Sequence, residues 1–427
     1  MIAVLRSKWH VLACVLICTL AASNIRWPER HINDLLQADA RGYYAYLPSV
    51  FLFRTLSVDS VFGHEARHLS DLQHVYDYRH VAPQGTVNKY FAGTAVCEAP
   101  FFLVAHGIAT SDADDSKGYG RPYMLAISVA GLSFLLLGLW CCDALLMRLG
   151  IGLWPRVVAI VSMCFGTNLF YYAAIEPGMS HVFSLGLVSL FLLLSLRQIP
   201  KGHGSLILGL ILGLITLIRP INILVLAGLP FIFILGDERL KVPRPDFLIR
   251  FALGVATLVL IQPLIYFLQT GSPWVYSYGD QTLNLLRPHL IDFLFSFKKG
   301  FLLYTPWAVL ALVGLYAVFR VNVKAGWAGL IFIVGLMYVL SSWEIWWYGG
   351  SFSARPMVEY LPFLLLPFAH LVQQIWQSRL RWPALALTFL LIGLCQFQTY
   401  QYRYYRIHWE DTDRTMYLHS FTSVGPE

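Results

Sequence analysis

Asp39 is the acidic residue of this sequence whose surroundings most favour chemistry. It precedes the aromatic run Tyr43, Tyr44 and Tyr46, beside a segment that we expect to lie at a membrane surface. A carboxylate in that position can take a proton from an acceptor hydroxyl or amine when its reach and its pKa allow. Aspartate before a helical run is also a common N-cap, so the spacing alone leaves both roles open.

Basic residues form a second group of candidates. Five of them fall at membrane edges where the topology derived below does not call for positive charge. Arginine and lysine bind phosphate oxygens through charge-assisted hydrogen bonds, so together the five predict an anion site, although each one alone is equally explained by surface charge or by contact with lipid head groups. They are Arg219, Arg287, Lys298, Lys299 and Arg355.

A third pattern is the run from His64 to His68, which matches H-E-x-x-H. In that motif two histidines one helical turn apart bind zinc, and the glutamate, here Glu65, acts as general base. The chain would then be a membrane zinc peptidase, with a third ligand from Asp71, His74 or Asp77. The segment shows no clear apolar helical stripe and we expect a loop there, so the peptidase is kept as the alternative.

Membrane helices are the elements that must position these residues. Of the 427 residues, 57% are hydrophobic and only 13% are charged, which is far from the composition of a soluble domain. Apolar runs long enough to cross a hydrocarbon core of about 30 Å recur along nearly the whole chain. We expect an all-α polytopic membrane protein, one domain over 1–427, with about eleven transmembrane helices near 9–24, 121–147, 155–171, 181–197, 205–218, 221–236, 249–268, 301–320, 326–342, 357–376 and 383–399.

The positive-inside rule orients this bundle, because a cytoplasmic N-terminus makes every cytoplasmic loop basic. The loops outside the cytoplasm are then 25–120, 172–180, 270–300 and 343–356, together with the tail 400–427. Within the large first loop, 43–56 and 91–108 are too short or too polar to span and are expected to be interfacial helices. The cytoplasmic basic residues are Arg6, Lys8, Arg148, Arg156, Arg197, Lys201, Arg239, Lys241, Arg244, Arg250, Arg320, Lys324, Arg379 and Arg381.

The distribution of charge and the spacing of the cysteines argue against a nucleic-acid-binding protein and against a disulfide-bonded one. The net charge of +7 is spread over small groups between apolar runs, so no nucleic acid partner is expected. The seven cysteines show no CxxC spacing and are interpreted as reduced core residues. The first apolar run, after Arg6 and Lys8, is equally typical of a cleaved signal peptide and of a first membrane helix.

Arg219 and Pro220 interrupt the apolar stretch 205–236. A charge at the middle of a bilayer would cost several kcal/mol, so we expect two arms that meet at these residues. Each arm of about 15 residues is roughly 22 Å long at helical rise, which would place the tip in a recess below the outer surface.

With these elements in place, the arrangement resembles the GT-C fold glycosyltransferases, the superfamily of the protein mannosyltransferases and of the aminoarabinose transferase of lipid A. In that family an acidic motif of the type Asp-Glu-x-x-Tyr follows the first membrane helix, and a lysine in an aromatic motif precedes the second. Segments 39–44 and 88–93 stand in those two places. They depart from the family at Ala40, where the family has a second acid, and at Asn88 and Tyr90, where it has an acid and a proline.

Two further loops, 176–181 and 343–355, resemble a bacterial branch of uncharacterised GT-C-like proteins and would frame the same cavity. The resemblance implies that Asp39 is the catalytic base or a carboxylate that positions the acceptor. It implies a GT-C-like module over about 1–270, followed by additional helices over about 300–400. The resemblance implies that Lys89 contacts the donor phosphate, and the full set of residues expected to bind the phosphate and the sugar of the donor is Lys89, Arg219, Lys298, Arg355, His181, Glu176 and Tyr348.

The expected function is transfer of a hexosyl or pentosyl group from a polyprenyl-phosphate donor, with inversion by resemblance, on the periplasmic face of a bacterial inner membrane. The phosphate leaving group needs preorganised positive charge while a base deprotonates the nucleophile. A divalent metal stays open, because some family members use one and others do not. The acceptor, whether glycan, lipid or protein, is not determined, and a lipid or sugar transporter is a further alternative that would need polar residues at the midplane of several helices.

Overall fold

The computed structural model describes residues 8–26, 35–68, 76–109, 118–196, 203–237 and 244–422, with the backbone alone at 25, 26, 66–68 and 203. Some residues named above lie outside this part of the chain, as does the end of the tail, 423–427. They are Arg6, Asp71, His74, Arg197, Lys201, Arg239 and Lys241.

The described chain is mostly helical, as predicted. Its main helices are α2 (Trp9–Arg26), α6 (Gly93–Ile108), α7 (Arg121–Arg148), α8 (Leu153–Phe165), α9 (Ser180–Leu196), α10 (His203–Ile218), α11 (Leu229–Leu235), α12 (Pro245–Val259), α13 (Ile261–Thr270), α16 (Trp307–Val321), α17 (Val323–Ser341), α18 (Leu361–Ile375) and α19 (Arg381–Arg403). Short helices and the one described hairpin connect them: α3 (Asp39–Tyr44), α4 (Tyr46–Pro48), η3 (Ser49–Phe53), α5 (Val58–His68), β1 (Arg79–Ala82), β2 (Gly85–Asn88), η6 (Tyr171–Ile175), η7 (Pro220–Gly228), α14 (Leu290–Phe295), α15 (Phe301–Tyr304), η8 (Arg355–Tyr360) and α20 (Arg414–His419).

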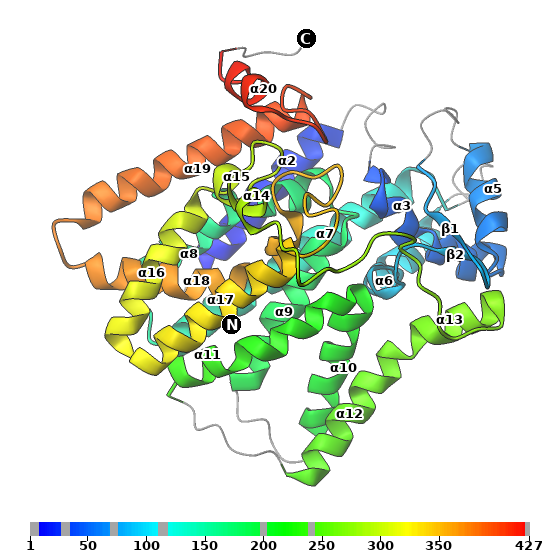
Figure 1. The fold of residues 1–427 in the computed structure, drawn as a ribbon, viewed down its shortest axis with the longest axis horizontal. Coiled ribbons are helices and arrows are strands. Elements are labelled where there is room, and N and C mark those ends of the chain that lie inside the picture. The colour runs from blue at the N-terminus through cyan, green and yellow to red at the C-terminus, as the bar shows by residue number, and fades with distance from the viewer. Residues whose placement is uncertain are drawn as a thin grey trace.

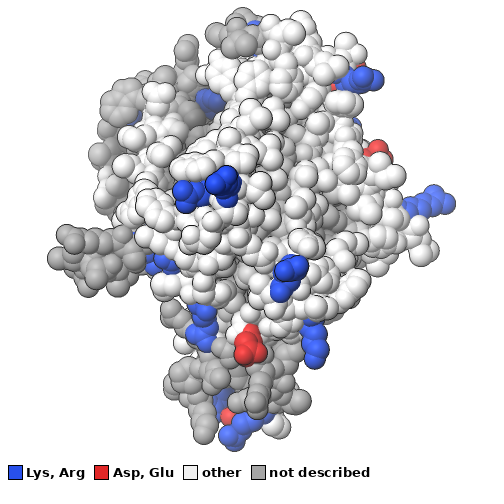
Figure 2. Space-filling view, turned by 90° about the vertical axis from the view of Figure 1, so that its left-hand side faces the viewer, with Lys and Arg blue, Asp and Glu red and all other residues white. Residues whose placement is uncertain are grey.

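Each of the eleven predicted spans corresponds to an observed helical segment. Among the described residues, four segments are long enough and apolar enough to cross a membrane: Arg121–Arg148, Pro245–Thr270, Val323–Ser341 and Arg381–Arg403. The other apolar helices are shorter, so the count of eleven membrane crossings stays a prediction. Figure 2 shows one face of the molecule that is largely uncharged, with lysines and arginines standing apart or in small groups and few acidic residues between them.

Close helix pairs hold the bundle together. α7 packs along α9, α16 along α18, and α10 along α12. The last pair approaches closely because glycines face each other across it: a Cβ at Gly209 would lie 2.1 Å from the carbonyl oxygen of Phe251, and one at Gly254 would lie 2.4 Å from that of Leu206. Small residues at such positions are a common device of membrane helix pairs.

A buried cluster of charges ties α2 to its neighbours. Lys8 Nζ lies 2.7 Å from Asp143 Oδ2, and His10 Nε2 lies 3.0 Å from Asp143 Oδ1. Arg156 Nη1, on α8, lies 3.6 Å from the same carboxylate. All four side chains are buried. Because a buried charge is costly without its partners, α2 is a structural member of the bundle.

The predicted break at Arg219 is confirmed. α10 ends at Ile218, Arg219 is extended with φ −150° and ψ 118°, and η7 begins at Pro220. Proline excludes the α conformation from the residue before it. The break therefore presents the Arg219 side chain at the meeting point of two helical arms.

The segment predicted to be an interfacial helix over 43–56 is helical as far as Phe53, and its place at a membrane surface stays a prediction. It forms α3, α4 and η3, in which Tyr44 and Leu47 are buried against other elements while Val50 and Phe51 are exposed. The hydroxyl of Tyr44 donates to the carbonyl of Gly118, and that of Tyr46 donates to the carbonyl of Tyr90 at 2.7 Å. These bonds satisfy the polar ends of the aromatic residues, which lets them enter the core. Figure 1 shows α3, α5, β1 and β2 gathered at the right of the view, away from the turns that join α16 to α17 and α18 to α19.

Candidate functional site

A cavity of about 640 Å³ lies where the break at Arg219, the start of α3, and the loops before α6 and η8 meet. Val339 and Leu340 of its wall belong to the last turn of α17, one of the four segments able to cross a membrane. Four charged residues predicted as site residues line it: Asp39, Lys89, Arg219 and Arg355. Its apolar lining includes Phe91, Ile221, Val275, Leu283, Val339, Leu340 and Ile345. The cavity therefore combines a charged region with an apolar wall beside a membrane helix.

Asp39 is held by two partners. Arg355 Nη2 lies 2.7 Å from its Oδ2, and the Tyr90 hydroxyl donates to its Oδ1 at 2.7 Å. The hydroxyls of Tyr90 and Tyr76 are 2.6 Å apart, which extends the network along the wall. Asp39 opens α3, but Ala38 is the N-cap residue there and adopts a left-handed φ of 46°. Asp39 is thus not the N-cap of α3, and its carboxylate faces the cavity.

The environment of Asp39 keeps it ionised. Burial acts to raise its pKa, but the Arg355 charge, the Tyr90 hydrogen bond and the Lys89 charge together hold the pKa below its ordinary value. For Lys89, burial lowers the pKa, with a smaller opposing effect from Asp39. Lys89 is partly buried, and its Nζ lies 5.7 Å from the centre of the Tyr278 ring. The Asp39 carboxylate, the Arg355 guanidinium and the Lys89 amine thus line the same cavity.

Arg219 reaches the cavity from the helix break and is backed by a carboxylate that the sequence did not reveal. Its Nη1 lies 2.8 Å from Oε1 of Glu359, which is fully buried in η8. His181 Nδ1 lies 2.9 Å from the same oxygen. His181, predicted as a donor-binding residue, does not line the cavity and instead lies behind Arg219. The sequence feature that could have indicated a role for Glu359 is its place as an acidic residue at the edge of the apolar run of α18.

Tyr348, which was predicted to bind the donor, also lines the cavity. Its ring lies 5.9 Å from the guanidinium carbon of Arg219, within reach of a cation–π contact. Its hydroxyl donates to the carbonyl of Leu340 at 2.7 Å. Tyr348 and Gly349 both have left-handed backbone, with φ of 58° and 67°. The loop bends at these two residues, and the ring of Tyr348 faces Arg219.

Besides His181, two predicted donor-binding residues lie outside the cavity lining. Glu176 is packed behind the wall, where the Tyr171 hydroxyl donates to its Oε1 at 2.7 Å. Burial raises the pKa of Glu176 to about 7, although the Tyr171 hydrogen bond and the Arg355 charge lower it. Lys298 pairs with Asp411 at 2.9 Å and lies 3.9 Å from the centre of the Trp347 ring. Neither side chain is placed to touch a ligand in the cavity.

The two remaining basic candidates differ in burial. Arg287 is exposed and does not line the cavity. Lys299 is buried, its Nζ donates to the carbonyl of His408 at 3.3 Å, and burial lowers its pKa to about 7. Lys299 is therefore a structural contact to the C-terminal segment rather than an exposed anion ligand.

The H-E-x-x-H segment forms helix α5, so the expectation of a loop was wrong. The ring of His64 stacks on Phe53 at 4.4 Å, and Glu65 is buried with its Oε1 3.7 Å from Arg41 Nε. Burial raises the pKa of Glu65 to about 7, against the lowering effect of Arg41. The side chain of His68 lies outside the described part. Within the described part, no group of three or more His, Cys, Asp or Glu residues is placed to hold a metal ion.

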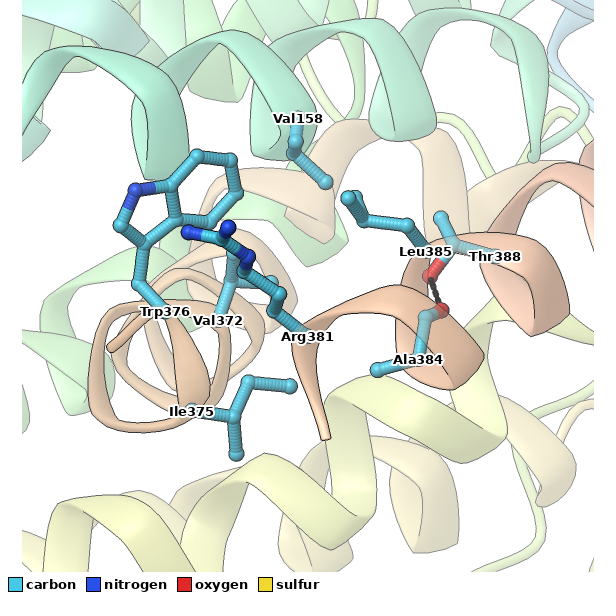
Figure 3. Close-up of a pocket in the computed structure, with 8 residues that line it drawn as sticks. All are labelled: Val158, Val372, Ile375, Trp376, Arg381, Ala384, Leu385 and Thr388. Carbon is cyan, nitrogen blue, oxygen red and sulfur yellow. Dashed lines mark hydrogen bonds between the residues drawn. The ribbon is translucent and has the colours of Figure 1, made fainter. Parts of the chain in front are cut away.

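A second, much smaller pocket lies among α8, α18 and α19 (Figure 3). Its volume is about 10 Å³, enough for about one water molecule. Most of its lining is apolar, and the Thr388 hydroxyl bonds to the carbonyl of Ala384 in its own helix. This pocket offers no arrangement for chemistry.

No protein-family profile matches this sequence, and no curated protein matches it either. Among solved structures, the chain is similar to the oligosaccharyltransferase of Archaeoglobus fulgidus in its apo form, with a TM-score of 0.52 and 12% identity over 95% of this chain and 57% of that one. A second structure, archaeal oligosaccharyltransferase AglB in complex with an inhibitory peptide and a dolichol-phosphate, gives a TM-score of 0.48, 11% identity, and coverage of 96% and 57%.

This chain therefore spans a little over half the length of those enzymes. At such low identity the similarity of the apo structure establishes the fold alone. The GT-C fold predicted from the sequence is confirmed.

Proposed function

We propose that this protein is a membrane glycosyltransferase that moves a sugar from a polyprenyl-phosphate donor to an acceptor at the extracytoplasmic surface. The observation that carries the proposal is the cavity in which Asp39 meets Lys89, Arg219 and Arg355 beside an apolar wall. A lipid-linked sugar phosphate has the matching parts: an apolar chain, an anion and a polar ring. The shared fold with an oligosaccharyltransferase supports this assignment.

In the proposed reaction an acceptor hydroxyl attacks the anomeric carbon of the donor. The bond from that carbon to the phosphate oxygen breaks, and the lipid phosphate leaves with the bonding electron pair. Lys89, Arg219 and Arg355 are preorganised to stabilise the charge that develops on the leaving group. The hydroxyl proton goes to Asp39, and every step uses side chains of this chain.

The ion pair between Asp39 and Arg355 adjusts the timing of proton transfer. A carboxylate with a lowered pKa is a weak base, so it accepts the proton late, when the attacking oxygen has begun to bond to carbon and has itself become acidic. A donor phosphate that binds Arg355 draws the guanidinium from Asp39 and makes the carboxylate more basic. Binding of the donor would thus make Asp39 a stronger base before the sugar is transferred.

The proposal is tested with purified protein in lipid nanodiscs and a panel of radiolabelled polyprenyl-phosphate sugars. We expect release of the sugar, to an acceptor or to water, from at least one donor. Asp39→Asn should abolish transfer, while Asp246→Asn, at an exposed position of α12, should not. If no donor in the panel is consumed, the proposed function is wrong, and if Asp39→Asn remains fully active, Asp39 is not the base.

A further inference from the structure

The C-terminal segment Ile407–Asp411, here called the C-terminal strap, forms part of the cavity wall. Trp409 and Glu410 line the cavity, although they lie far along the chain from the residues opposite them. The strap follows α19 and precedes α20, which Figure 1 shows at the top of the molecule beside α14 and α15. None of the charged groups used in the proposed mechanism belongs to it.

Several contacts fix the strap in place. Lys298 Nζ lies 2.9 Å from the Asp411 carboxylate, and the buried Lys299 donates to the carbonyl of His408 at 3.3 Å. Trp347 Nε1 donates to Glu410 Oε1 at 3.3 Å. The two lysines thus anchor the strap from the loop before α15, and Trp347 anchors it from the loop before η8. These contacts make the strap a fixed part of the cavity wall.

α20 holds the far end of the strap. The Asp413 side chain caps this helix by accepting a hydrogen bond from the Met416 backbone at 2.8 Å. Tyr417 of α20 packs on Tyr304 and Phe297, with ring centres 5.6 and 5.4 Å apart, and accepts a hydrogen bond from Gln398 at 2.6 Å. Both ends of the strap are therefore packed against the bundle.

A glycine lets the strap approach the opposite loop closely. A Cβ at Gly350 would lie 2.9 Å from a ring carbon of Trp409, so a side chain at position 350 would push the indole away. Trp409 nevertheless keeps 46% of its surface exposed. The indole is thus packed along one edge and lies 5.5 Å from the His408 ring, between ring centres, and the exposed part of its surface is open to a ligand.

The chemistry of this corner differs from that of the donor site. An exposed indole offers a flat apolar face, and the Glu410 carboxylate accepts hydrogen bonds from hydroxyl groups. A sugar ring can contact both groups, because the C–H groups on its face pack on an indole and the hydroxyls on its edge donate to a carboxylate. Of the two strap residues that line the cavity, Glu410 is the charged one, and its carboxylate favours hydroxyl groups over a phosphate.

We propose that Trp409 and Glu410 form the acceptor subsite and that the acceptor is a carbohydrate, so that the chain extends or decorates a glycan. This inference rests on the proposed function, because it assigns the second substrate of the same cavity. The donor is held by the cations around Arg219 and Arg355. The acceptor sugar stacks on Trp409, donates hydroxyl hydrogen bonds to Glu410, and presents one further hydroxyl to Asp39.

The test measures two reactions of the full chain in nanodiscs with the same donor: transfer to water, and transfer to soluble methyl glycosides or to a serine- and threonine-containing peptide. Wild type should glycosylate at least one methyl glycoside. Trp409→Ala and Glu410→Gln should each raise the KM for that glycoside by about tenfold, with the donor KM and the rate of transfer to water unchanged. Trp409→Phe, which keeps an aromatic face, should recover most of the loss.

Trp154→Ala is the matched control, because Trp154 is similarly exposed, at 55%, and does not line the cavity. It should leave both reactions unchanged. Transfer to the peptide, or to none of the glycosides, would overturn the inference, as would an unchanged glycoside KM in Trp409→Ala. A wild-type protein that consumes no donor at all would instead overturn the proposed function, so the two failures are distinguishable.

Discussion

Arg219 and Glu359, 140 residues apart in the sequence, form an ion pair with 2.8 Å between Nη1 and Oε1. The carboxylate is fully buried behind the cavity wall, whereas the guanidinium reaches the cavity. Glu359 therefore compensates the Arg219 charge from behind and fixes the direction in which the guanidinium points, so that its remaining donors can face an anion.

We expect Glu359→Gln to raise the KM for a polyprenyl-phosphate donor by about tenfold or more, with a smaller change in kcat, because the mutation leaves Arg219 without its counter-charge. The measurement is the donor dependence of transfer in nanodiscs. Glu98→Gln is the control, since Glu98 is equally buried but lies outside the cavity lining. An unchanged donor KM in Glu359→Gln would show that Glu359 does not position Arg219.

Asp39→Asn should lower the transfer rate by about 10²- to 10⁴-fold, the usual contribution of a general base. Because the pKa of Asp39 is lowered, its carboxylate stays ionised as the pH falls. The wild-type kcat/KM, which reports the donor-free protein, should therefore show no acid limb attributable to Asp39 above its ordinary pKa of 3.8. A pH–rate profile checks this, and an acid limb near neutrality that disappears in Asp39→Asn would contradict it.

Glu176 should make the protein less stable as the pH rises. Its pKa is about 7 in the folded protein and 4.5 as the ordinary value. An acid whose pKa is raised on folding contributes stability that is full below its unfolded pKa and is lost as the pH rises through the folded value. Glu176→Gln should therefore raise the melting temperature at pH 8 and flatten its decline between pH 5 and pH 8, which differential scanning fluorimetry can follow. An equally steep decline in the variant would rule out Glu176 as the titrating group.

Asp143→Asn should destabilise the bundle by about 3–5 kcal/mol, the range found when one member of a buried charge pair is removed. Lys8, His10 and Arg156 would be left without their common counter-charge. Thermal unfolding in detergent measures the effect, with the exposed Asp246→Asn as the reference variant. A melting temperature equal to that of the reference would mean that the cluster does not hold α2.

Glu65→Gln should leave transfer within about twofold of wild type, because Glu65 is buried beside Arg41 and lies outside the cavity lining. Metal analysis of the purified protein accompanies the assay. Stoichiometric zinc, together with a peptidase activity lost in Glu65→Gln, would instead favour the peptidase alternative.

Positive charge that membrane orientation does not explain was a partial guide to the cavity, because it also selected Arg287, Lys298 and Lys299, which do not line it. Arg219 and Arg355 were found because positive charge at those edges is not explained by membrane orientation, and both line the cavity. Asp39 was found from its aromatic surroundings. The break at Arg219 and Pro220 followed from the cost of placing a charge at the middle of a bilayer.

Residues that act through a distant partner could not be predicted in this way. Glu359 and Tyr90 acquire a role only when folding brings them to Arg219 and Asp39, and spacing along the chain carries no sign of those pairs. For the same reason His181 was assigned to the ligand although it contacts Glu359 behind the wall. The helix at α5 was missed because its buried face contacts a hairpin rather than a continuous apolar core.

The charge cluster around Asp143 also constrains how the protein is made. Lys8 leaves the ribosome 135 residues before the carboxylate that neutralises it, and Arg156 follows later still. Until α7 and α8 have been synthesised, the start of α2 carries cations without their native partner. α2 can therefore reach its native packing only after α7 and α8 have been synthesised, although the helices from α9 onward are not needed for it.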